Sequence, residues 1–75
     1  MNKDDAIELR DHGLRAIEEL TLLLNIAWER CSEDERQRIR RGVGLSIGRI
    51  DVDLLSVLYE QHPEIDHLRD RTNGA

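Results

Sequence analysis

The stretch RRGVGLSIGRID, residues 40–51, holds three of the five glycines and decides the fold. Apolar residues keep a helical rhythm of three- and four-residue steps across it, at Ile39, Val43, Ile47, Ile50, Leu54 and Val57. A loop would have no reason to keep this spacing. We therefore predict a continuous helix, although each glycine costs up to about 1 kcal/mol relative to alanine. In the alternative, Gly42 ends one helix and Asp51 caps the next, which gives a three-helix bundle with a break at residues 42–51.

Local signals set the bounds of the predicted helices. Asn2 can cap a first helix over residues 3–30, and SEDE, residues 32–35, is a capping box in which Ser32 and Glu35 satisfy each other's backbone amides. The second helix is then expected over residues 33–61, because Pro63 prevents its continuation. A short helical turn is expected at residues 63–69 and a frayed tail at 70–75, so the chain forms a single helical domain over residues 1–75.

Two apolar stripes run along the first predicted helix. The first stripe consists of Ala6, Leu9, Gly13, Ala16, Leu20, Leu23 and Ala27. In an antiparallel hairpin this stripe can face the second helix, pairing Leu20 with Val43, Ala16 with Ile47, Gly13 with Ile50, Leu9 with Leu54, and Ala6 with Val57. Close approach of the helices is expected at the small residues Gly13, Ala16, Gly44 and Gly48.

Two rods of roughly 42 Å cannot cover all of their apolar surface, and soluble monomers rarely expose a large apolar patch. We therefore predict an all-α, homodimeric four-helix bundle. The expected dimer interface consists of Ile7, Leu14, Ile17, Leu24, Trp28, Leu45, Val52, Leu55 and Tyr59.

Charge and composition narrow the function classes. The net charge of −5 disfavours general nucleic-acid binding, yet residues 36–50 carry five arginines and no acid. Cys31 is the only cysteine, which suits a reducing cytoplasm, and we expect neither a signal peptide nor a membrane span. The chain is thus expected to be cytoplasmic.

Candidate chemical motifs are weak. GVGLSIG, residues 42–48, lacks the lysine of a phosphate-binding loop, so we expect no cofactor. The groups at His62, Glu64, Asp66 and His67 fit no standard metal site, so no metal is expected either. A buried, inert Cys31 is favoured over a thiol activated by Arg30.

These patterns predict a small non-enzymatic adaptor or regulatory module that binds itself and another protein. Arg36, Arg38, Arg40 and Arg41 are the expected contacts for an acidic partner or anion. The alternative is an RNA- or DNA-binding hairpin that uses the arginine belt of residues 36–49.

Overall fold

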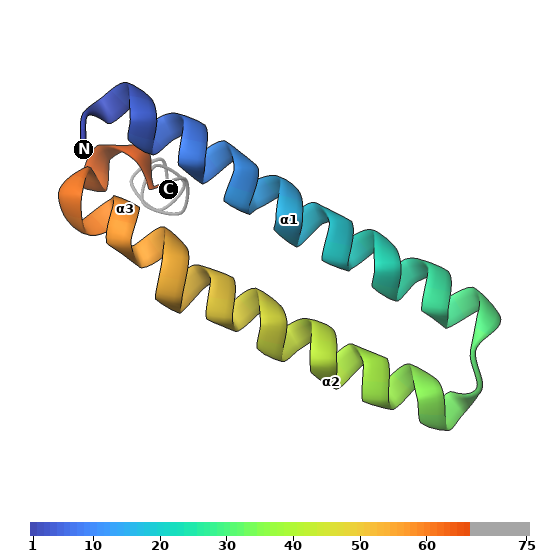
Figure 1. Cartoon of the computed structure of the whole chain (residues 1–75). Helices are drawn as coiled ribbons and strands as arrows, with labels where there is room; N and C mark the ends of the chain where they lie inside the picture. The colour runs from blue at the N-terminus through green and yellow to red at the C-terminus, as the bar shows by residue number, and fades with distance from the viewer. Residues whose placement is uncertain (67–75) are drawn as a thin grey trace, which may run out of the picture.

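The computed structural model describes residues 1–66, which form an antiparallel helical hairpin measuring 45 × 28 × 16 Å (Figure 1). The long helix α1 spans Lys3–Arg30 and the helix α2 spans Glu33–Arg49. A π-helical segment η1, Ile50–Leu55, joins α2 directly to α3, Ser56–Gln61, and a 3-10 turn η2 follows at Pro63–Ile65. The predicted all-α hairpin is confirmed. The remainder of the turn expected at 63–69, and the tail at 70–75, lie outside the described residues.

The connection between α1 and α2 is as short as the capping signals predict. Cys31 and Ser32 alone join the two helices, at an end that we call the tip. The Ser32 amide donates to Glu35 Oε1 at 2.9 Å, and the Glu35 amide donates to Ser32 Oγ at 3.3 Å, so the capping box is formed. At the opposite, open end, Asn2 Oδ1 accepts from the Asp5 amide at 2.8 Å and starts α1.

The glycine-rich stretch is helical, and the alternative break at residues 42–51 is wrong. None of the described glycines has a positive φ, so Gly42 does not end a helix in the usual left-handed conformation. The helix is nevertheless not uniform, because the Ser56 amide donates to the carbonyl of Asp51, five residues earlier. Such a bond marks a π turn, which takes one residue more than an α turn.

The π turn shifts the buried face by one residue, which corrects the predicted pairing. Val43 is buried and Ile47 and Ile50 are half-buried, as the rhythm of three and four requires, but the next buried positions are Leu55 and Leu58. The expected inner positions Leu54 and Val57 are turned outward, with Leu54 60 % exposed and Leu55 1 % exposed. On α1, the stripe residues Leu9, Ala16 and Leu23 are likewise exposed rather than packed inside the hairpin.

The core is small and lies toward the open end. Ala6, Leu55, Leu58 and Ile65 form its buried cluster, and Ile7, Leu14, Ile17, Ile50 and Tyr59 pack partly against it. Arg10 Nη1 donates to the carbonyl oxygen of Ile65 at 2.8 Å and so holds η2 against α1. Toward the tip, Ala27 and Val43 are the only buried apolar residues among the described positions. A layer only two helices thick therefore leaves most apolar side chains at the surface.

Candidate interaction surface

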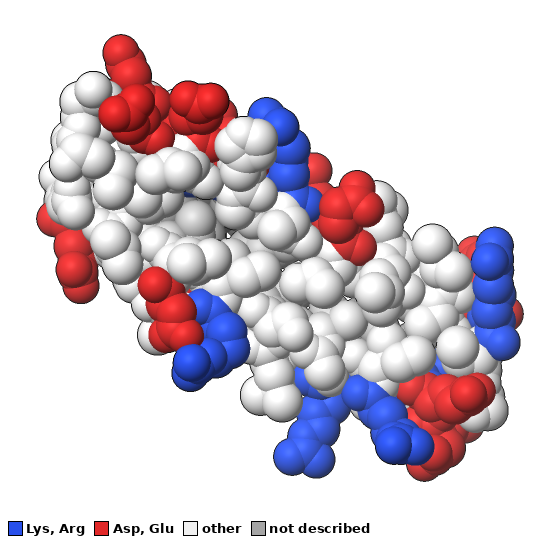
Figure 2. All heavy atoms as spheres, viewed as in Figure 1, with Lys and Arg blue, Asp and Glu red and all other residues white. Residues whose placement is uncertain are grey.

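Large apolar side chains are exposed along both long segments of the hairpin. They are between 39 % and 66 % exposed and comprise Met1, Leu9, Leu22, Leu23, Ile26, Trp28, Leu45, Val52, Leu54 and Val57. Figure 2 shows a band of uncharged side chains that follows both helices on the visible face, with most charged side chains along its margins. Isolated exposed leucines are ordinary on protein surfaces, whereas several exposed apolar side chains that line one continuous surface are typical of an interaction surface.

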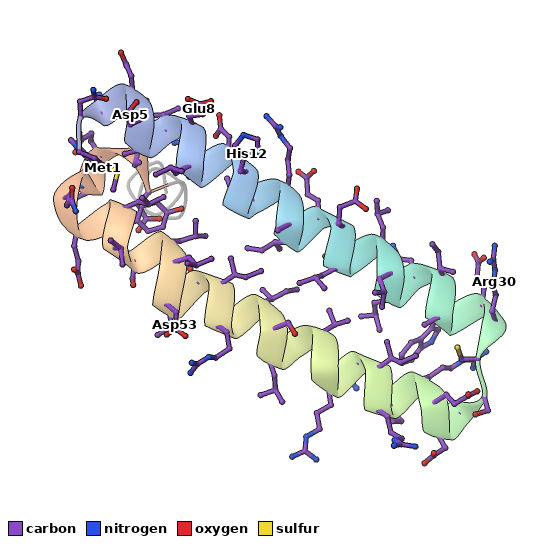
Figure 3. The ribbon with its side chains drawn as sticks, viewed as in Figure 1. Met1, Asp5, Glu8, His12, Arg30 and Asp53 are labelled. Carbon is purple, nitrogen blue, oxygen red and sulfur yellow. The ribbon has the colours of Figure 1, made fainter. Side chains whose placement is uncertain are left out.

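A groove of about 490 Å³ lies in this surface between α1 and the η1–α3 segment. We call it the Gly13 groove. Its apolar wall includes Leu9, Gly13, Ala16, Leu54, Val57 and Leu58. His12 on α1 and Asp53 on η1, both labelled in Figure 3, are its polar lining residues. Met1 lines the groove at the open end. The π turn creates one side of this groove, because it places Leu54 and Val57 outside the core.

An apolar ridge continues from the groove toward the tip. We call Leu20, Leu23 and Ile26, which recur every three positions of α1, the Leu23 ridge, because Leu23 and Ile26 are 47 % and 49 % exposed while Leu20 is half-buried. These three residues border a shallow depression that Ala16, Glu19 and Leu22 also line. Ala16 also lines the Gly13 groove. Groove and ridge therefore belong to one apolar face of α1, with the groove in its first half and the ridge in its second.

The structure distributes the residues of the expected dimer interface over three environments. Leu55 must be corrected, because it is 1 % exposed and packs in the core of its own chain, although it lies at the floor of the Gly13 groove. Ile7, Leu14, Ile17 and Tyr59 pack partly against the core of their own chain, and Leu24 is half-buried near the tip. Trp28, Leu45 and Val52 remain exposed. Sequence periodicity did not single out Leu9, Leu54 and Val57 as surface residues, because it places them inside the hairpin.

The residues expected to allow close helix approach also separate into two groups. A Cβ atom added to Gly13 would lie 2.8 Å from Leu55 Cδ2, so the two segments of the hairpin do approach closely there. Gly44 and Gly48 have no atom of another segment within 4 Å of such a Cβ position. Ala16 is exposed. Within one chain, the close approach therefore occurs at Gly13 alone among these four positions.

The arginines of α2 do not form one cationic face. Arg36 is half-buried, with its guanidinium carbon 5.8 Å from the centre of the Trp28 ring and Nη1 3.7 Å from Glu33 Oε2. Arg38 Nη1 lies 3.9 Å from Asp34 Oδ2 on the same helix. Arg40 and Arg41 are exposed and have no ion pair with any residue between 1 and 66. The charges of Arg36 and Arg38 are thus partly offset by neighbouring side chains, whereas those of Arg40 and Arg41 are available to a partner.

The acidic and histidine residues after α3 close the open end of the hairpin. His62 Nδ1 lies 3.4 Å from Glu64 Oε1, and its Nε2 lies 3.0 Å from the carbonyl oxygen of Met1. A hydrogen bond from its own amide, and then the contact with His62, lower the pKa of Glu64 below its ordinary value of 4.5.

Within residues 1–66, no three side chains of the His, Cys, Asp and Glu types are placed to hold a metal, and His67 lies outside the described residues.

Two smaller observations concern the tip and the long helices. Cys31 is a free thiol within the two-residue connection between α1 and α2, and it is half-buried rather than buried as expected. Neither α1 nor any other described helix combines the length and the apolar character that crossing a membrane requires.

Comparisons of the chain with protein-family models, with curated proteins and with solved structures gave no match.

Proposed function

We propose that this chain associates with a second copy to form a homodimeric four-helix bundle and acts as a small, non-enzymatic adaptor or regulatory module. The observation that carries the proposal is the largely apolar face shared by the Gly13 groove and the Leu23 ridge, whose charged lining residues are Glu19 and Asp53. Covering such a face removes apolar area from water, which is worth roughly 25 cal/mol per Å². A chain whose own core is this small gains a substantial part of its stability from that association.

A second copy is the most economical cover for this face. Homodimers with two-fold symmetry are the commonest form of soluble oligomer, and two hairpins packed face to face give a four-helix bundle. The lone Cys31 is consistent with a reducing compartment, so we place the module in the cytoplasm.

Sedimentation equilibrium over a dilution series tests the association. The expected mass at high concentration is twice the 8.7 kDa of one chain, and it should fall toward 8.7 kDa on dilution. The Leu23→Glu variant places a charge on the exposed ridge and should shift the equilibrium to the monomer, since an unpaired charge is costly to bury. Arg15→Glu, a charge change at another exposed position of α1, serves as its control. A wild-type chain that stays monomeric at every concentration refutes the proposal.

The second part of the proposed function is recognition of an acidic partner protein by the exposed arginines of α2. Arg40 and Arg41 support this part, because their charges are not offset by an ion pair with any described side chain. Reversal of Arg38, Arg40 and Arg41 to glutamate should leave the circular dichroism spectrum unchanged and abolish capture of the partner from the native host. The Arg15→Glu control should leave capture intact. Capture that survives the reversal of Arg38, Arg40 and Arg41 removes this surface from the proposal.

Nucleic-acid binding through the same arginines is the competing function. It requires the cationic side chains to line one surface, whereas Arg36 packs on Trp28 and Arg38 pairs with Asp34. Binding of this kind would weaken steeply as salt increases. A gel-shift assay with short RNA and DNA at low salt distinguishes the two, and a strong salt-dependent shift would favour nucleic acid over a protein partner.

A further inference from the structure

We infer that the two copies pack antiparallel about a two-fold axis, with the Leu23 ridge of each chain seated in the Gly13 groove of the other. In this arrangement, which we call head-to-tail packing, the tip of each copy lies beside the open end of the other. This inference rests on the proposed homodimer and specifies its geometry. The groove and the ridge share one apolar face of α1, and Ala16 lines both. A two-fold axis perpendicular to α1 beside the middle of this face exchanges its two halves. Each ridge then lies over the partner's groove, and both contacts form at once.

The residue sizes on α1 match this exchange. An axis near residue 18 places Leu20 opposite Ala16 of the partner subunit, two residues on either side of the axis. It also places Leu23 opposite Gly13 of the partner subunit, five residues on either side. Leu20 therefore meets a small residue, which is how packed helices interdigitate. Leu23 meets the open groove beside Gly13, because Leu55 of the same chain already fills the space of the missing Gly13 side chain. The partner's Leu23 would enter the groove between Leu9 and Val57, where about 490 Å³ is open.

A parallel pairing uses the same face less well. A two-fold axis along the length of the hairpin would bring ridge against ridge at the tip and groove against groove at the open end. Leu23 would then meet Leu23 of the partner subunit, and the grooves would stay unfilled. Dispersion contacts are lost wherever apolar walls face an empty space. Shape therefore favours the head-to-tail arrangement.

The charge distribution favours the same arrangement. In the open-end half, residues 1–16 and 47–66 carry four basic and nine acidic side chains, whereas residues 17–46 in the tip half carry five basic and six acidic ones. Parallel packing would place two halves of formal charge −5 side by side, within the distance at which charges still interact at physiological salt. Head-to-tail packing sets each −5 half beside a −1 half. It also brings Arg30 of each copy near Asp5 of the other, which lie at opposite ends of α1 (Figure 3).

A spin label on Cys31, the only cysteine, measures the arrangement directly. Cys31 lies 13 residues from the proposed axis, so two labels should be separated by about 39 Å along the helix direction at 1.5 Å per residue. In a parallel dimer both tips lie at the same end, and the separation should be close to the helix spacing of about 10 Å plus the label arms. A short distance in a protein that sediments as a dimer overturns the orientation and leaves the proposed dimer intact. A monomer by sedimentation overturns both.

Charge exchange in the unlabelled chain provides a second test. Asp5→Arg alone and Arg30→Asp alone should each weaken the dimer, because each places like charges opposite one another. The double variant restores opposite charges and should return the dissociation constant toward the wild-type value. Leu23→Ala should raise the dissociation constant about tenfold or more, since the contact occurs twice. Leu45→Ala should change it little, because Leu45, although exposed and expected from the sequence at the interface, lines neither the groove nor the depression beside the ridge. Additive losses in the double variant, or equal effects of the two leucines, overturn the inference.

Discussion

The π turn determines which of two neighbouring leucines, Leu54 or Leu55, is buried. A regular α-helix would keep the three- and four-residue rhythm and point Leu54 toward α1, but the structure buries Leu55 and exposes Leu54. Replacing Leu55 by alanine therefore removes a fully buried side chain. Such a replacement costs about 2–5 kcal/mol of unfolding free energy, and a value near 3 kcal/mol is expected in this thin core, where neighbours can partly collapse into the space.

The assay is urea unfolding followed by far-ultraviolet circular dichroism, with a thermal melt of each variant. A loss of about 3 kcal/mol should lower Tm by about 12–24 °C, since 1 kcal/mol corresponds to about 4–8 °C in a domain of this size. Leu54→Ala is the matched control and should cost no more than about 0.5 kcal/mol in the isolated chain. Because Leu54 lines the Gly13 groove, the two variants are compared over a dilution series, and the contribution of association is the part that vanishes on dilution. Equal losses in the dilute chain, or a larger loss for Leu54→Ala, would refute the π-turn register.

Three further outcomes follow from the structure. Gly44→Ala should stabilise the chain by up to about 1 kcal/mol, because its new Cβ meets no other segment. Gly13→Ala should give a smaller gain or a loss, because its Cβ meets the buried Leu55. Chemical denaturation measures the free energy of unfolding of both variants. Ser32→Ala should cost about 1 kcal/mol in the same assay, and equal stability would show that the capping box contributes nothing. Hydrogen bonds from the Ser32 amide and hydroxyl hold the pKa of Glu35 below 4.5. The contribution of the Glu35 carboxylate to the free energy of unfolding is therefore present above that pH and is lost as the pH falls through the lowered pKa. Unfolding measured over a pH series should show this loss in the wild-type chain and not in Glu35→Gln.

Local sequence determines the helices and the turn of this protein. Asn2 begins α1, the Ser32–Glu35 capping box begins α2, and Pro63 follows the end of α3, each through hydrogen bonds or steric limits within a few residues. The apolar rhythm across Gly42 predicts helix rather than loop, because its period of three and four residues is set by helix geometry. These features could be predicted because the interactions that produce them lie within one or two helical turns.

The candidate surface was predicted less well than the helices. That apolar side chains would remain uncovered follows from length and composition, and the exposed Trp28, Leu45 and Val52 were expected at the surface. The Gly13 groove and the exposed Leu54 were not expected, because both depend on which residue of the second segment turns inward. No pattern in the arginine belt indicated that Arg36 would pack over Trp28, since that contact joins two helices across the tip.

Only tertiary packing decides between Leu54 and Leu55. Both are leucine, so hydrophobicity and helix propensity are equal at the two positions and the sequence permits either register. In the folded chain, Leu55 enters the space left by the missing side chain of Gly13, where even one added carbon would lie 2.8 Å away. A π turn gains this contact at the cost of a rarer hydrogen-bond pattern. The chain alone specifies two helices and their connection, and the fit of one leucine against one glycine specifies which faces they bury and which they leave exposed.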